Sequence, residues 1–145
     1  MKSYIEKASL PIQGLSPHFI GAWNLYPHSI CEEIIDYFES NNDKQSKGVI
    51  TGGQNTDIKN STDIKITPKE IKLPGNEVFD KYFHLLFSCY EEYVNCWPFL
   101  KSFAENLFIG DFNLQRYKSG QHFQRTHTER SSLETLHRLF AWMTY

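Results

Sequence analysis

Apolar residues recur at helical spacing in a first stretch that begins near Ser29. They occupy one face, while acidic residues lie largely on the other, which is the pattern of an amphipathic helix packed on a core. Ser29 and Glu32 have the spacing of a capping box, in which each side chain satisfies the other residue's free backbone amide. The polar run 40–43 should end this helix. Its apolar face consists of Ile30, Ile34, Tyr37 and Phe38.

A second and longer stretch of helical periodicity runs from Val78 to Val94. Asn76 is placed to act as its N-cap, because an Asn side chain accepts hydrogen bonds from free helix amides. The helix should end before Pro98. Large aromatic side chains usually serve burial, so we expect the aromatic face of this helix to pack against a sheet.

Other segments alternate between apolar and polar residues, which is the period of a β-strand. Residues 62–67 predict a short strand, and Gly48–Thr51 predicts an earlier one. The loop between them, residues 52–61, is rich in Gly, Asn and Asp, and we expect it to be mobile. Pro and Gly punctuate residues 1–27, which predicts extended segments with one or two edge strands.

The clearest strand pattern covers residues 111–117. Phe112 and Leu114 should face one side of this strand. The residues that should face the other side are Asn113, Gln115 and Tyr117. A turn at 118–120, a polar extended segment at 122–129, a loop at 130–134 and a last strand at 136–145 should follow. The pattern predicts an α+β fold in which two helices pack on a mainly antiparallel sheet.

Composition indicates one globular domain over residues 1–145. Apolar residues make up 40% of the chain and aromatic residues 15%, which is enough to form a core. The net charge is −2, and no run of Lys and Arg is longer than a pair. Nucleic-acid binding usually needs a basic surface, so we expect no nucleic-acid partner. No stretch has the ~20 apolar residues of a membrane span, so we expect no membrane partner either.

Cysteine usage favours a reducing compartment. The three residues Cys31, Cys89 and Cys96 are widely spaced and match no disulfide framework or zinc motif. The first residues contain no continuous apolar run of the kind found in secretory signals. We therefore expect reduced thiols and a cytoplasmic protein.

The triplet His127-Thr128-Glu129 is the best candidate for chemistry. In an extended segment, residues i and i+2 project to the same side, so the imidazole and the carboxylate can reach one metal ion. One further His would complete the 2-His-1-carboxylate triad of non-heme Fe(II) oxygenases. Taken alone, the triplet also fits a surface His beside a solvated Glu.

The surrounding residues resemble the prolyl 4-hydroxylase-like Fe(II)- and 2-oxoglutarate-dependent oxygenases. That family has a strand ending in Tyr, a glycine-containing turn, an aromatic residue and then His-x-Asp or His-x-Glu. The matching positions are Tyr117, Gly120, Phe123, His127 and Glu129. Residues 60–64 and 138–145 also resemble family segments, so the resemblance covers roughly residues 20 to 145, with residues 113–145 as its most specific part.

The resemblance implies a fold and a set of roles. The fold would be a double-stranded β-helix, or jelly-roll, which is incomplete in this chain and has the N-terminal helices packed on it. His127 and Glu129 would bind Fe(II), with Glu standing where many members have Asp. Tyr117 would contact the co-substrate 2-oxoglutarate, with Gln115 on the same strand face. The family hydroxylates peptides and small molecules, and nothing in the chain selects one substrate.

Two family residues have no counterpart among residues 1–145. The distal His ligand and the Lys or Arg that pairs with 2-oxoglutarate lie on later strands in the family. We therefore expect this chain to be truncated relative to the family and inactive by itself. The rival hypothesis is a non-catalytic jelly-roll binding or oligomerisation module, in which an open sheet edge pairs with a second copy. A nucleophilic hydrolase is disfavoured, because no GxSxG motif occurs.

Overall fold

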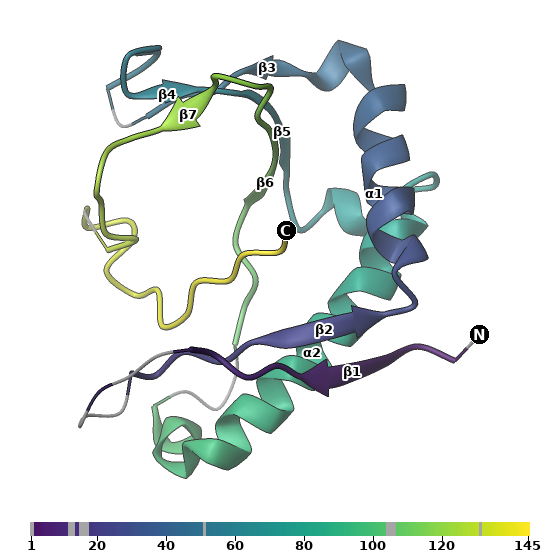
Figure 1. Cartoon of the computed structure of the whole chain (residues 1–145), viewed down its shortest axis with the longest axis vertical. Coiled ribbons are helices and arrows are strands. Elements are labelled where there is room, and N and C mark those ends of the chain that lie inside the picture. Colours follow the sequence, from purple (N-terminus) through teal and green to yellow (C-terminus); the bar gives the residue numbers. More distant parts are fainter. Residues whose placement is uncertain (1, 12–13, 15–17, 51, 104–106, 131) are drawn as a thin grey trace. The chain divides into compact units, whose positions relative to one another are not determined.

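The computed structural model of the chain describes residues 2–11, 14, 18–50, 52–103, 107–130 and 132–145 (Figure 1). The α-helices are α1 (Ser29–Ser40) and α2 (Glu77–Cys96). Three short 3₁₀ helices are η1 (Asn42–Lys44), η2 (Glu70–Lys72) and η3 (Pro98–Ser102). The β-strands are β1 (Tyr4–Lys7), β2 (Trp23–Tyr26), β3 (Ser46–Lys47), β4 (Lys59–Asn60), β5 (Thr62–Ile66), β6 (Phe112–Arg116) and β7 (His122–Phe123).

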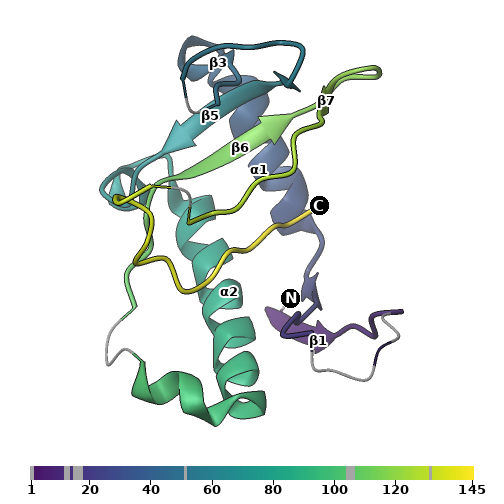
Figure 2. The same ribbon diagram turned by 90° about the vertical axis from the view of Figure 1, so that its left-hand side faces the viewer.

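The chain divides into two compact units. The first consists of Met1–Gln45 and Ile64–Leu114, and the second of Ser46–Asp63 and Gln115–Tyr145. The three described sheets are small and have the orders β1-β2, β3-β5-β6 and β4-β7. Figure 2 shows the arrows of β5 and β6 lying side by side and running in opposite directions. These features confirm the α+β class and the antiparallel pairing.

The core of the first unit lies between the two α-helices and the neighbouring parts of β5 and β6. Phe79 of α2 and both isoleucines of β5, Ile64 and Ile66, are fully buried. The ring of Phe79 meets the rings of Tyr37 and Phe112 edge-on, at centroid distances of 4.8 and 5.7 Å. The aromatic face of α2 therefore serves burial against a sheet, as its spacing predicts.

The helix boundaries agree with the periodicity, but the predicted capping of α1 is wrong. Ser29 is the first residue of α1, and His28 at the N-cap position makes no side-chain capping bond. His28 already has helical backbone angles, whereas an N-cap needs an extended conformation. A pair with the same spacing occurs at Thr67 and Glu70 instead. There the amide and the hydroxyl of Thr67 donate to Oε2 of Glu70, at 2.8 and 2.7 Å.

Asn76 occupies the predicted N-cap position of α2 but does not cap it through its side chain. Its side-chain amide donates to the backbone carbonyl of Glu70 at 2.6 Å, and Asn76 is itself buried. The residue therefore ties the start of α2 to η2. The amide is oriented toward this carbonyl, so the prediction was right about position and wrong about the bond.

The strand predictions had mixed outcomes. Residues 62–67 and 111–117 contain β5 and β6, and residues 1–27 contain the antiparallel hairpin β1–β2. The predicted strand Gly48–Thr51 is wrong, because pairing with β5 occurs at Ser46 and Lys47; Thr51 lies outside the described residues. The loop 52–61 contains β4, which pairs with β7.

The predicted strand at 136–145 is also wrong. Residues 133–137 form turns, and residues 138–145 have no regular secondary structure. Alternation describes which side chains favour burial, but a strand also needs a ladder partner. Leu139 and Met143 of this segment are 44% and 67% exposed. Within the described ranges, neither α-helix is long and apolar enough to cross a membrane.

Candidate metal centre and adjoining polar cluster

The segment that carries the predicted iron ligands is held in the second unit by a short strand pair. The turn after β6 places Gly120 at a φ of 81°, a conformation that favours glycine. β7 then pairs with β4, with His122 opposite Asn60. The amide of Gln124 donates to the carbonyl of Ile58 at 2.9 Å, so the pairing continues past β7.

His127 and Glu129 lie side by side, as their spacing predicts. Nε2 of His127 is 3.5 Å from Oε1 of Glu129, and the two side chains are 43% and 39% exposed. Nδ1 of His127 is 3.1 Å from the carbonyl oxygen of Arg125. Because a carbonyl only accepts, Nδ1 must carry a proton, and the neutral ring presents the lone pair of Nε2 toward Glu129. The Nε2 lone pair and the carboxylate oxygen repel each other, and a cation between them, either a proton or a metal ion, removes this repulsion.

The other carboxylate oxygen of Glu129 has a different partner. Oε2 is 2.9 Å from Nη1 of Arg138. Both side chains are more than a third exposed, so this ion pair contributes about 0–1 kcal/mol. The pair draws one carboxylate oxygen away from His127, and a metal ion bound by both carboxylate oxygens would have to displace Arg138.

These residues fit part of an Fe(II) site. An imidazole nitrogen and a carboxylate are the ligand types of the facial triad, and a backbone carbonyl on the second ring nitrogen is the usual support for a metal-bound His. The triad needs a third ligand. Over the ranges that the structure describes, no group of three or more His, Cys, Asp or Glu residues is arranged to hold a metal ion. We therefore derive no reaction step through iron for this chain.

The imidazole of His127 is also held by an aromatic contact. It stacks on the ring of Phe123 with a centroid distance of 4.7 Å and an interplanar angle of 26°. Nζ of Lys59 lies 5.7 Å from the centre of the same Phe123 ring, within cation–π range. Phe123 thus connects the candidate ligand to Lys59.

Lys59 belongs to a buried ion pair that the sequence analysis missed. Its Nζ is 2.6 Å from Oδ2 of Asp63, and the two side chains are only 4% and 8% exposed. The hydroxyl of Ser61 donates to the other carboxylate oxygen at 2.7 Å. Buried charges are tolerated when they are paired and hydrogen-bonded in this way. The sequence did contain a signal for this pair. In an extended segment, residues 59, 61 and 63 project to the same side, so their side chains can contact one another.

A close approach of the backbone completes this cluster. The amide of Gly48 donates to the carbonyl of Ser61 at 3.0 Å. A Cβ on Gly48 would lie 2.2 Å from Oγ of Ser61 and 3.0 Å from the Lys59 side chain. Any larger residue at position 48 would therefore push the Ser61 hydroxyl out of the cluster.

The two predicted co-substrate residues, Gln115 and Tyr117, adjoin the same cluster. The Gln115 amide nitrogen lies 3.5 Å from Oδ2 of Asp63, a long contact, and the Tyr117 hydroxyl donates to Oε1 of Gln115 at 3.3 Å. Burial raises the pKa of Tyr117, a hydrogen bond with Ser61 opposes the rise, and the Asp63 carboxylate adds to it. The phenol is therefore a proton donor at neutral pH. The structure brings the four predicted site residues together as two pairs: Gln115 with Tyr117, and His127 with Glu129.

Comparisons with known proteins add no relative. No protein-family model matches the chain, and neither a curated protein nor a solved structure matches it.

Proposed function

We propose that the chain belongs to an Fe(II)- and 2-oxoglutarate-dependent oxygenase of the prolyl 4-hydroxylase type, acting on a peptide or a small molecule. The observation that carries the proposal is the pairing of His127 Nε2 with Glu129 Oε1 at 3.5 Å. The proton on Nδ1 faces the Arg125 carbonyl, which leaves Nε2 as a ligand atom. The order of Tyr117, turn, aromatic residue and His-x-Glu along the chain supports the same assignment.

In this proposal each residue has a limited task. Iron, if bound there, would supply O₂ activation coupled to decarboxylation of 2-oxoglutarate. His127 and Glu129 hold the metal, and the protonated phenol of Tyr117, held by Gln115, donates a hydrogen bond to the co-substrate. Two protein ligands bind iron more weakly than three, so we expect measurable binding but no succinate formation by this chain.

The proposal includes a fold and a location. We propose that the β3-β5-β6 sheet and the β4-β7 pair correspond to part of a jelly-roll. We also propose a cytoplasmic protein, because all three cysteines are free thiols.

The test is an anaerobic Fe(II) titration with and without 2-oxoglutarate, in which equilibrium dialysis measures the bound iron. The wild type should bind one Fe(II), and His127→Ala and Glu129→Ala should each abolish that binding. His137→Ala is the matched control, because His137 is an exposed histidine of the same unit, and it should bind like the wild type. The assignment fails if the wild type does not bind, or if His137→Ala loses binding as His127→Ala does.

A second candidate function is a non-catalytic oligomerisation module. It is favoured by exposed apolar side chains near the end of the second unit, where Leu133 is 88%, Met143 67% and Tyr145 fully exposed. β6 is also the last strand in the described order of its sheet, so one edge of it lies outside the ladder. Light scattering should then give a dimer or larger species, and a monomer at every concentration would exclude this function.

A further inference from the structure

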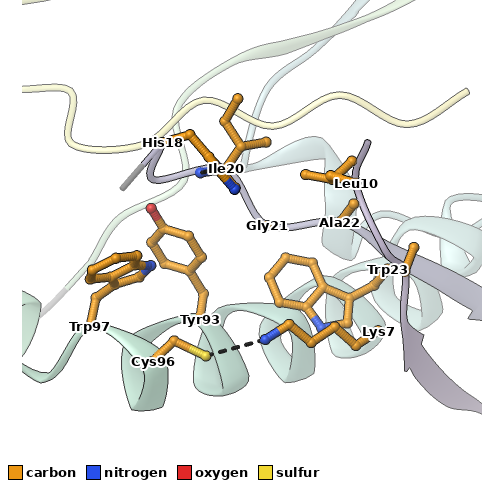
Figure 3. A pocket seen from close by; sticks show the side chains of 11 residues that line it. Lys7, Leu10, His18, Ile20, Gly21, Ala22, Trp23, Tyr93, Cys96 and Trp97 are labelled. Carbon is orange, nitrogen blue, oxygen red and sulfur yellow. Dashed lines mark hydrogen bonds between the residues drawn. The ribbon is translucent and has the colours of Figure 1, made fainter. Parts of the chain in front are cut away.

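A cavity of about 250 Å³ lies in the first unit (Figure 3), and none of its described lining residues takes part in the proposed function. Its walls come from the N-terminal hairpin, from the segment leading into β2 and from the C-terminal end of α2. Typical sites for drug-sized ligands have about 300–1,000 Å³, so this cavity suits a smaller molecule.

Three aromatic side chains form its apolar walls: Trp23, Tyr93 and Trp97. The polar ends of Trp23 and Tyr93 have partners. Nε1 of Trp23 donates to Oε2 of Glu92 at 2.7 Å, and the Tyr93 hydroxyl donates to the carbonyl of Phe19 at 2.6 Å. The Trp23 and Tyr93 rings meet edge-on, with centroids 6.4 Å apart. Because the polar atoms of Trp23 and Tyr93 are engaged, these side chains line the cavity mainly with ring carbon, which suits an apolar ligand.

The shape of one wall depends on Gly21. A Cβ at this position would lie 2.2 Å from the outer carbon of the Trp23 indole and 3.0 Å from the Tyr93 ring. Only glycine lets the backbone pass this close to both rings. The wall is therefore a packed surface that forms with the fold.

Lys7 is the one side chain with a permanent charge among the described lining residues, and the Glu92 carboxylate, which is not among them, is bonded to the Trp23 indole nitrogen. Lys7 and His18 line the cavity, and none of the described lining residues is Asp or Glu. Nζ of Lys7 is 3.4 Å from Sγ of Cys96, and Figure 3 shows the two side chains pointing toward each other. A thiol is a weak acceptor, whereas an ammonium has three donors, so Lys7 retains donors for a stronger acceptor.

His18 supplies a second donor. Its Nδ1 accepts the backbone amide of Ile20 at 3.1 Å, and the neutral ring therefore carries its proton on Nε2. Aromatic walls together with donors of positive or neutral charge complement a planar ring that bears an anionic oxygen group. We propose that this cavity binds a small planar aromatic carboxylate, with its ring against Trp23, Tyr93 and Trp97 and its carboxylate on Lys7.

The test uses 2-naphthoate as the probe, with quenching of tryptophan fluorescence and equilibrium dialysis as readouts. 2-Naphthylmethanol has the same ring without the charge and should bind roughly tenfold more weakly, because it lacks the charge-assisted hydrogen bond. Lys7→Met should weaken naphthoate binding by a similar factor, Lys7→Arg should retain it, and Trp97→Leu should weaken both probes. Lys69→Met removes an exposed lysine of the same unit and should change nothing.

Circular dichroism of each variant separates loss of binding from loss of fold. If Lys7→Met does not fold, two measurements still test the proposal. They are the ratio of the affinities of the wild type for naphthoate and naphthylmethanol, and the affinity of Trp97→Leu for both probes. Absence of naphthoate binding to the wild type would overturn the proposal. Equal binding of the two probes, or binding unchanged in folded Lys7→Met and Trp97→Leu, would overturn it as well. Neither readout involves Fe(II) or 2-oxoglutarate, so the result is independent of the proposed oxygenase function.

Discussion

Removing one partner of the buried pair Lys59–Asp63 should cost far more stability than removing one partner of an exposed ion pair with a similar nitrogen–oxygen distance. The exposed pair Lys65–Asp111 offers a comparison, because its nitrogen–oxygen distance is 2.7 Å, against 2.6 Å for the buried pair. The side chains of the exposed pair are 64% and 45% accessible, while those of the buried pair are 4% and 8% accessible. Distance is matched between the two pairs, and burial is the variable.

Lys59→Met leaves the Asp63 carboxylate buried without its cation, which costs about 3–5 kcal/mol of unfolding free energy. Lys65→Met leaves an exposed carboxylate that water solvates, at a cost of about 0–1 kcal/mol. Replacing both charges, in Lys59→Met with Asp63→Leu, removes the orphaned charge but leaves the Ser61 hydroxyl without its acceptor, a cost of about 1–3 kcal/mol. Adding Ser61→Ala should bring the triple variant close to the wild type.

Urea denaturation followed by far-UV circular dichroism measures these differences. With a slope of about 2 kcal/mol per molar urea, Lys59→Met should lower the midpoint by about 1.5–2.5 M, and Lys65→Met by less than about 0.5 M. Equal midpoints for the two single variants would refute the reasoning. So would a double variant that is no more stable than Lys59→Met, because the cost would then come from lost packing instead of an unpaired charge.

Three further residues, Arg138, Cys89 and Glu70, give testable predictions. Arg138→Gln removes the partner of Glu129 Oε2 and should tighten Fe(II) binding by up to about fivefold in the dialysis assay. Arg125→Gln is the control and should bind Fe(II) like the wild type. An unchanged or weaker affinity in Arg138→Gln would contradict the prediction. Burial raises the pKa of Cys89 from 9.0 to about 11, so iodoacetamide at pH 8 should modify exposed Cys96 well before Cys89, as read by peptide mass spectrometry. The raised pKa also means that the thiol of Cys89 keeps its proton in the folded state at a pH where the unfolded state has lost it. The free energy of unfolding should therefore fall by at most about 2–3 kcal/mol as the pH rises from 9 to 11. Cys89→Ala should remove this pH dependence. Hydrogen bonds from the hydroxyl and amide of Thr67 lower the pKa of Glu70, so its stabilisation is fully present above pH 4.5 and is lost as the pH falls through the lowered pKa. Glu70→Gln should therefore reduce the thermal midpoint at pH 7, and the difference from the wild type should shrink as the pH falls below 4.5; a difference that does not shrink would contradict this.

The elements that could be predicted from sequence are those whose signal is local. α2 was predicted nearly to its ends, because its apolar spacing runs for five turns and Pro98 follows. β5 and β6 also follow their alternation. The capping box at Ser29 failed because capping depends on the backbone angles at the helix start, and a residue pattern does not specify these.

The signals that failed depend on partners distant in sequence. Residues 136–145 alternate like a strand, yet no ladder forms there, since pairing is decided by which segments meet. The Lys59–Asp63 pair was missed for a related reason. Lys59 lies in the polar stretch 52–61, which favours a loop, and Asp63 lies in the predicted strand 62–67. Only the pairing of β4 with β7 and of β3 with β5 buries the side of the chain that they share.

The site itself combines both kinds of information. The spacing of His127 and Glu129 was sufficient to predict that their side chains meet, because it is a property of extended chain. The orientation of the His127 imidazole depends on residues that are distant in sequence. Asp63 fixes Lys59, Lys59 lies over Phe123, and Phe123 stacks on His127, so a buried ion pair positions an exposed ring. Substituting Lys59 would therefore disturb the proposed ligand atom, Nε2 of His127, as well as the core. For this reason the strength of Fe(II) binding should depend on a residue that touches neither the metal nor its ligands.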